Sequence, residues 1–200
     1  MGKKIKYIKK ETITIDKTAK IGKNVTIYPN NFIGENVIIG DNVILYSGNF
    51  LENCTIKDDC VIGPYARIRP KTIVKKSCKI GNFVELKNCI IGENTKVSHL
   101  TYVGDSVVGK DCNIGCGVVF ANYNGKIKQK ITVGNNVFVG SNSNLIAPLN
   151  ISDSVYICAG TTVTNDLDEF DFCIGRSRQW VKKDGAKKYL KNEQMFEKDT

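Results

Sequence analysis

A repeat of six residues constrains this sequence more than any other feature. Isoleucine, leucine or valine recurs at every sixth position in several series, and glycine often follows it. The first series is Ile21, Ile27, Ile33, Ile39, Leu45 and Leu51. This period fits neither an amphipathic helix nor the simple alternation of a hairpin meander. It is typical of a hexapeptide β-helix, in which each repeat supplies one short strand and one corner.

The repeat also predicts how the chain is divided. It shifts phase by single-residue deletions before Ile56, Ile91 and Val108, and by an insertion at residues 121–132. Because stacked repeats bury one another, we expect residues 19–166 to form one body in which the apolar residues point inward. Glycine after them is expected to provide the backbone angles of the corners. Residues 1–18 are predicted to be a basic N-terminal segment.

The C-terminal residues 167–200 leave the repeat and are predicted to form an arm. Its stretch Asp184–Phe196 is rich in alanine, leucine and lysine, which favour a short helix. A solvated tail is the alternative interpretation. An arm of this kind can cross to another subunit.

The net charge of +9 lies at the two ends of the chain. Residues 1–20 carry seven lysines against two acids, residues 176–200 carry eight basic against four acidic residues, and residues 21–175 balance. A nucleic-acid-binding domain usually shows a basic stripe on its folded body, so we expect no nucleic-acid partner. No apolar run is long enough for a membrane span, and no secretory signal is present. We therefore expect a cytoplasmic protein.

The eight cysteines are expected to be reduced and structural. Five of them stand two residues before an inward apolar residue: Cys54, Cys60, Cys78, Cys89 and Cys112. A reduced cysteine behaves as a small apolar side chain, which suits such a position. With no CxxC motif and one histidine, a metal site is not expected.

Counting along the repeat places charged residues above one another. Three repeats of six residues make one full coil, so residues 18 apart should lie above one another at the strand spacing of about 4.8 Å. Arg67 then lies under Glu85 as an ordinary ion pair, whereas Arg69 lies under Lys87. Like charges placed directly opposite each other are unfavourable, and a phosphate between them would reverse the interaction. The alternative is two solvated cations that splay apart.

The non-repeat residues carry a closer resemblance. The stretches that carry it are GPYARIRP (63–70), GNFVELKN (81–88), HLTYVGD (99–105), NIGCG (113–117), NYNGKIKQK (122–130), VGSNSNLIAP (139–148) and AGTTVTNDL (159–167). Over about residues 60–176 the chain resembles the acetyltransferase domain of the bacterial bifunctional glucosamine-1-phosphate N-acetyltransferase/N-acetylglucosamine-1-phosphate uridyltransferase. This resemblance implies a left-handed parallel β-helix that forms homotrimers, and acetyl-CoA as co-substrate.

The resemblance also implies roles for particular residues. His99 would be the general base, and histidine can accept a proton near neutral pH. The residues that would bind a phosphorylated amino sugar are Arg69, Lys87, Tyr102, Asn113, Asn122, Lys128 and Glu85, with Asn122 and Lys128 completing the site of a neighbouring subunit. Those that would contact acetyl-CoA are Cys116, Tyr123, Ser141, Ala159 and Arg176. The amide of Cys116 is the expected oxyanion donor.

The chain also departs from the family pattern. It begins almost at the β-helix and lacks the glycine-rich loop of a nucleotidyltransferase, so we expect it not to make the UDP-sugar. Cys116 stands where alanine is usual, and VVFA at 118–121 is atypical. Two alternatives stay open: an acyltransferase for another amino sugar or nucleotide-linked amino sugar, and a non-catalytic β-helix that pairs with a separate nucleotidyltransferase.

Overall fold

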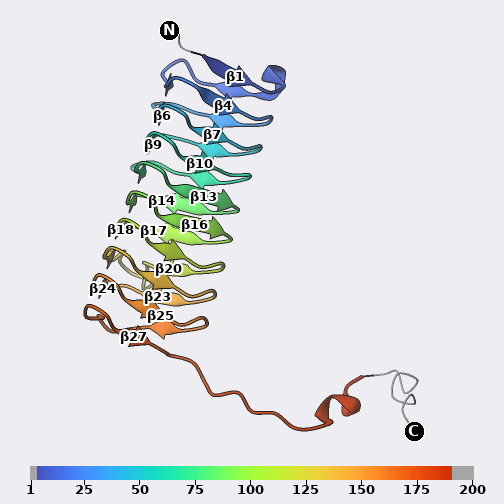
Figure 1. The fold of residues 1–200 in the computed structure, drawn as a ribbon, viewed down its shortest axis with the longest axis vertical. Helices are drawn as coiled ribbons and strands as arrows, with labels where there is room; N and C mark the ends of the chain where they lie inside the picture. The colour runs from blue at the N-terminus through green and yellow to red at the C-terminus, as the bar shows by residue number, and fades with distance from the viewer. Residues whose placement is uncertain (1–3, 191–200) are drawn as a thin grey trace.

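The protein folds as a left-handed parallel β-helix, as the six-residue repeat and the family resemblance predict. The computed structural model describes residues 4–190 (Figure 1). Short strands run around a triangular coil and stack along the long axis into three parallel sheets, here called A, B and C. The strands turn from A to B at the AB corner and from B to C at the BC corner. No helix among residues 4–190 is long and apolar enough to cross a membrane.

The three sheets contain every strand of the described residues. Sheet A contains, in order, β1 (Ile5–Tyr7), β4 (Val25–Ile27), β7 (Ile44–Leu45), β10 (Val61–Ile62), β13 (Lys79–Asn82), β16 (Lys96–His99), β19 (Asn113–Ile114), β22 (Phe138–Val139), β25 (Tyr156–Ile157) and β27 (Phe172–Cys173). Sheet B contains β2 (Thr14–Ile15), β5 (Phe32–Ile33), β8 (Phe50–Leu51), β11 (Arg67–Ile68), β14 (Glu85–Lys87), β17 (Tyr102–Gly104), β20 (Val119–Ala121), β23 (Asn144–Ile146) and β26 (Thr162–Val163). Sheet C contains β3 (Lys20–Ile21), β6 (Ile38–Ile39), β9 (Thr55–Ile56), β12 (Ile73–Val74), β15 (Ile90–Ile91), β18 (Ser106–Val108), β21 (Ile131–Val133) and β24 (Leu149–Ile151). Two 3₁₀ turns, η1 (Lys10–Thr12) and η2 (Gly185–Lys188), complete the set.

The core is one column of inward apolar side chains. Each strand places its repeat residue inside, and the buried residues form one continuous cluster along the solenoid. Cys54, Cys60, Cys78, Cys89 and Cys112 lie in this cluster, as predicted. Because every coil covers the next, removing one coil would expose the apolar surface of both neighbours.

Most glycines after the inward residues serve a different purpose from the one predicted, although Gly63 does adopt a positive φ of 93°. Left-handed backbone angles in the corners fall mostly on asparagine and aspartate, such as Asn36 and Asn94. The repeat glycines instead permit the close approach of adjacent coils: a Cβ on Gly81 would overlap the carbonyl oxygen of Ser98.

The β-helix begins earlier and ends later than its predicted bounds of 19 and 166. Strand β1 pairs with β4, and Thr14 pairs with Phe32, so residues 5–18 form a coil of the solenoid. Apolar side chains of this coil, Ile5 and Ile15 among them, pack against the core and cap it. At the other end β27 pairs with β25 and adds a further rung.

The predicted C-terminal helix is only partly present. The chain leaves the solenoid after β27 and extends away from it (Figure 1). Within the predicted stretch Asp184–Phe196, the structure has the single turn Gly185–Lys188, and residues 191–196 lie outside the described part. A helix this short is unstable without an apolar face packed on a neighbour, and the described part of the arm, residues 167–190, contains no buried residue.

Candidate active site

His99 stands at the end of β16, exposed at the AB corner. Its Nδ1 lies 2.6 Å from Oδ1 of Asn82, its register partner one coil below. An amide oxygen accepts a hydrogen bond, so Nδ1 carries the proton and Nε2 keeps a free lone pair. The Thr101 hydroxyl donates to the carbonyl of His99 at 2.7 Å and fixes the backbone there. This is the arrangement that a general base requires.

A cluster of charges occupies the BC corner, at the other edge of sheet B. Arg67 lies opposite Glu85 in the register, as predicted, but its guanidinium is 3.9 Å from the carboxylate. Arg69 is closer, with Nη1 2.9 Å from Glu85 Oε1. Lys87 pairs with Asp105, Nζ to Oδ2, at 3.5 Å. Each of the two cations expected to bind phosphate, Arg69 and Lys87, is therefore also held by a carboxylate.

Asp105 is the centre of this cluster, and the sequence did not single it out. Asn88 donates to its Oδ1 at 2.6 Å, and Lys87 and the amide of Asn122 approach Oδ2. Burial alone would raise the pKa of Asp105. The Asn88 hydrogen bond, the Lys87 charge and the Asn122 hydrogen bond outweigh it, and hold the pKa below its usual range.

We expect Asp105→Asn to flatten the acid limb of the stability curve. Because the pKa of Asp105 is lower in the folded chain, its stabilising effect is complete above the unfolded value of about 3.9 and is lost as the pH falls through the folded pKa. The unfolding free energy of the wild type should fall more steeply below pH 4 than that of Asp105→Asn. Urea unfolding between pH 2.5 and 6 measures this, and parallel curves would contradict it.

The inserted segment adds a fourth cation, Lys128, to the cluster. It folds back on itself through a bridge between Tyr123 and Lys128, and Gln129 donates to the carbonyl of Asn122 at 2.7 Å. Proximity to Lys87 lowers the pKa of Lys128, first by a hydrogen bond and then by charge repulsion. Lys87 in turn has a raised pKa, from the hydrogen bond with Lys128 and the Asp105 charge. Asn122 and Lys128 thus lie beside the cluster of their own chain.

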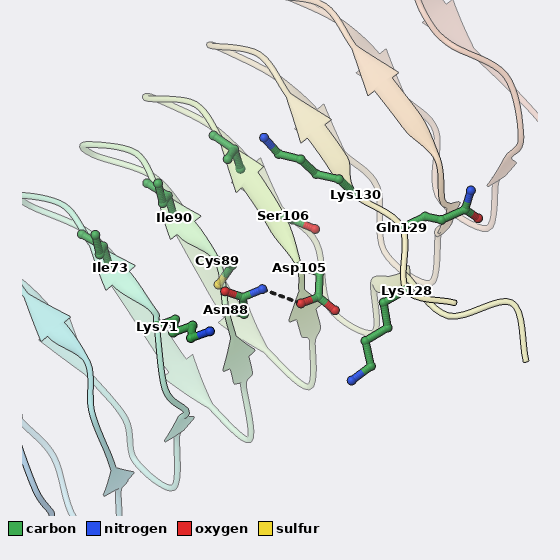
Figure 2. A pocket seen from close by; sticks show the side chains of 11 residues that line it. Lys71, Ile73, Asn88, Cys89, Ile90, Asp105, Ser106, Lys128, Gln129 and Lys130 are labelled. Carbon is green, nitrogen blue, oxygen red and sulfur yellow. Dashed lines mark hydrogen bonds between the residues drawn. The ribbon is translucent and has the colours of Figure 1, made fainter. Parts of the chain in front are cut away.

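A pocket of about 440 Å³ lies behind this cluster, over sheet C. Its floor includes Ile73 and Ile90, and its rim includes Lys71, Asp105 and Lys128 (Figure 2). His99 does not line it. The pocket was not predicted, because the sheet C residues of its floor carry no motif and only the fold brings them beside Asp105 and Lys128.

Four of the residues predicted to bind the coenzyme lie above His99 along the AB corner. They are Cys116, Ser141, Ala159 and Arg176. The amide of Gly117 donates to the His99 carbonyl at 3.4 Å. The carbonyls of Cys116 and Ser141 accept from the next corner at 2.8 Å in each case, and that of Ala159 accepts from Arg176 Nη1 at 2.6 Å. We call these four residues, one per coil above His99, the AB file.

Three predicted residues lie elsewhere. Tyr123 is on the inserted segment at the BC corner, where its hydroxyl donates to the carbonyl of Gly125 at 2.6 Å. Asn113 faces outward from sheet A, whereas Tyr102 faces outward from sheet B. The Tyr102 hydroxyl lies over Gly104, where any Cβ would overlap it. One chain therefore does not bring Asn113, Tyr102 and Tyr123 to one place.

Comparison of the sequence with known families identifies the family of this chain. The family model of the GMPPB C-terminal domain matches residues 9–64 and 50–124, more than half of the chain. The chain belongs to the GMPPB C-terminal domain family. Curated relatives match a longer part of the chain. It is 46% identical over 173 residues to bifunctional protein GlmU of Clostridium kluyveri, and the aligned region covers 84% of this chain and 38% of that protein. The resemblance to the bifunctional enzyme is thereby confirmed.

Other relatives and solved structures agree with this family. GlmU of Clostridium botulinum (strain Langeland) is 53% identical over 131 residues, 63% of this chain and 29% of that protein. The chain thus spans less than two fifths of the curated relatives that it matches. LpxA of Bacteroides fragilis, a UDP-N-acetylglucosamine acyltransferase, superposes with a TM-score of 0.53 at 20% identity, covering 78% of this chain and 67% of that one. The Arabidopsis UDP-N-acetylglucosamine acyltransferase gives 0.51 at 20% identity, covering 81% and 69%. These two show the fold alone.

Proposed function

We propose that this protein is an acetyl-CoA-dependent N-acetyltransferase that acts on glucosamine 1-phosphate. One observation carries the proposal: Nε2 of His99 is kept free by Asn82 at one edge of sheet B, while a cluster rich in cations occupies the other edge. The acceptor would lie across sheet B, with its phosphate toward Lys87 and its amine toward His99. The GlmU relatives are consistent with such a reaction.

The chemistry follows from the AB corner. The acceptor reacts as the neutral amine, and Nε2 of His99 takes one proton from its nitrogen as that nitrogen attacks the thioester carbonyl. The N–C bond forms, the C–S bond then breaks, and the proton can return to the departing thiolate. The amide of Cys116, one coil above, donates no hydrogen bond to any residue between 4 and 190. It is available to stabilise the developing oxyanion.

The BC corner supplies the charge for a phosphate. Arg67, Arg69, Lys87 and Lys128 exceed the carboxylates of Glu85 and Asp105 in number, so the cluster carries a positive excess. A phosphate dianion beside Lys87 and Lys128 would relieve their repulsion and restore the lowered pKa of Lys128. Such charge-assisted hydrogen bonds are about twice as strong as neutral ones.

The acyl donor would extend along the AB file. Four rungs separate His99 from Arg176, about 19 Å at the spacing of β-strands. A long, thin pantetheine arm fits a straight corner of this kind, because exposed backbone groups repeat along it. Arg176 would then meet the phosphates at the far end.

A thiol-release assay tests the proposed activity. Acetyl-CoA is supplied with glucosamine 1-phosphate, with glucosamine or with a UDP-linked amino sugar, and free CoA is measured. We expect the highest kcat/KM with glucosamine 1-phosphate. A preference for the UDP-linked sugar would assign a different acceptor, and no release with any acceptor would refute the enzyme.

Cys116 should be the thiol that reagents reach first. It is half-exposed at the AB corner, whereas burial raises the pKa of Cys54 and of Cys89 to about 12 and keeps them protonated. Burial also raises the pKa of the half-exposed Cys173. We expect limited iodoacetamide treatment to modify Cys116 before the others and to inactivate the enzyme, with CoA protecting it. Peptide mass spectrometry reads this out, and earlier modification of Cys54 or Cys89 would contradict it.

We further propose a homotrimer in the cytoplasm. Sheet C carries an outward apolar row, Ile38, Ile73, Ile90 and Val107, with Ile38 43% and Ile73 38% exposed. Burying such a row against another copy is favourable. A trimer would also bring Asn113 of one copy toward Tyr102 of another. Light scattering should give three times the chain mass of 22.2 kDa, and a monomer would contradict this.

A further inference from the structure

Three aromatic rings form an exposed stack on sheet A. Phe138, Tyr156 and Phe172 are register partners on β22, β25 and β27. Their centroids are 4.6 and 5.2 Å apart, and neighbouring ring planes lie within 15° of parallel. The inner rings cover each other, but β27 is the last strand of its sheet, so no described strand covers the outer face of Phe172. Phe172 is 66% exposed.

This stack runs beside the AB file. Each ring precedes a corner by three residues: Phe138 precedes Ser141, and Tyr156 precedes Ala159. Three residues of strand span about 10 Å. Phe172 likewise precedes Gly175, the corner residue above Ala159, by three residues, and Arg176 follows Gly175 directly. Between residues 4 and 190 Arg176 makes no ion pair, and its bond to the Ala159 carbonyl leaves most of its donors unused.

We propose that the outer face of Phe172 stacks the purine base of the acyl donor while Arg176 binds its phosphates. The inference rests on the proposed use of acetyl-CoA and assigns the nucleotide end of that molecule. A guanidinium and an aromatic face about 10 Å apart match a ligand that carries phosphates at one end and a flat base at the other. The base would extend the stack by one member at the open end of the solenoid.

The described part of the chain's own arm, up to residue 190, does not occupy this face. Trp180, its one indole, is 82% exposed and is stacked on none of the described rings. A second stacked pair, Phe32 and Phe50, lies on sheet B with centroids 4.4 Å apart. It is far from the AB file and provides a matched control.

Calorimetric binding of CoA and of 4′-phosphopantetheine, which lacks the base, tests the proposal without catalysis. The variants are Phe172→Leu, which keeps an apolar side chain without a π face, Phe172→Trp, which keeps the face, and the control Phe32→Leu. We expect Phe172→Leu to weaken CoA about tenfold and to leave 4′-phosphopantetheine unchanged. Phe172→Trp and Phe32→Leu should bind CoA as the wild type does.

The outcomes separate this inference from the proposed activity. Equal CoA affinity in wild type and Phe172→Leu would overturn the stacking site. The same conclusion would follow if Phe172→Leu weakened the binding of CoA and of 4′-phosphopantetheine equally, or if Phe172→Trp weakened the binding of CoA. A wild type that binds CoA but transfers no acetyl group would refute the activity and leave the stacking site standing. A wild type that binds no CoA would overturn both.

Discussion

Replacing His99 with alanine should lower the turnover number about 10²–10⁴-fold, the usual contribution of a general base. The amine must lose a proton to attack the thioester, and His99 is the one histidine in the chain. Because the side chain is exposed and its one hydrogen bond among the described residues is to Asn82, its loss should not disturb the fold. The KM values should change much less than kcat. Initial rates of thiol release measure both.

The control for His99→Ala is Lys96→Ala on the same strand. Lys96 is also exposed and faces outward from β16, but it lies at the start of the strand, away from the AB corner. Its replacement should leave kcat within about twofold, as is usual for surface positions. A His99→Ala enzyme as fast as this control would remove the imidazole from the mechanism.

Lys87→Met should raise KM for glucosamine 1-phosphate about 10–100-fold and change KM for unphosphorylated glucosamine little. A hydrogen bond to a charged group contributes about 1.5–3 kcal/mol, and only the phosphorylated acceptor makes it. The methionine keeps most of the aliphatic volume of the half-buried lysine. The difference between the KM changes for the two acceptors therefore measures the contact between Lys87 and the phosphate.

Two further variants make the Lys87 result specific. Lys76→Met breaks an exposed ion pair with Asp58, 3.3 Å long, and should leave both KM values unchanged. Lys87→Arg keeps the charge beside Asp105 and should recover much of the affinity. Equal losses with both acceptors would mean that Lys87 supports the fold around Asp105 and does not bind phosphate.

The fold could be predicted because the six-residue repeat shows directly which side chains point inward. A residue such as Ile68 recurs in phase with Leu86, and counting 18 residues gave the true partner, Arg67 opposite Glu85. The deletions then change the count to 17, as for Glu85 opposite Tyr102. The bounds were less predictable, since the first coil breaks the six-residue spacing before Ile15, and Tyr7 pairs with Ile27 20 residues along the chain.

The side-chain contacts of the site could not be counted in this way. Long side chains can pair with residues other than their register partners, as Arg69 does in its ion pair with Glu85. Asn82 could have been found from its place 17 residues before His99, given the deletion between them. Asp105 offered a weaker signal, because its importance depends on two amide side chains 17 residues away, Asn88 and Asn122, that donate to it from the adjacent coils.

A crystal structure with N-acetylglucosamine 1-phosphate and CoA bound tests the central claim most directly. The account predicts the sugar across sheet B, with its phosphate on Lys87 and Arg69 and its amide nitrogen within hydrogen-bond reach of His99 Nε2. The CoA sulfur should lie beside Cys116. A sugar phosphate bound away from sheet B, or with its nitrogen out of reach of that imidazole, would contradict the account.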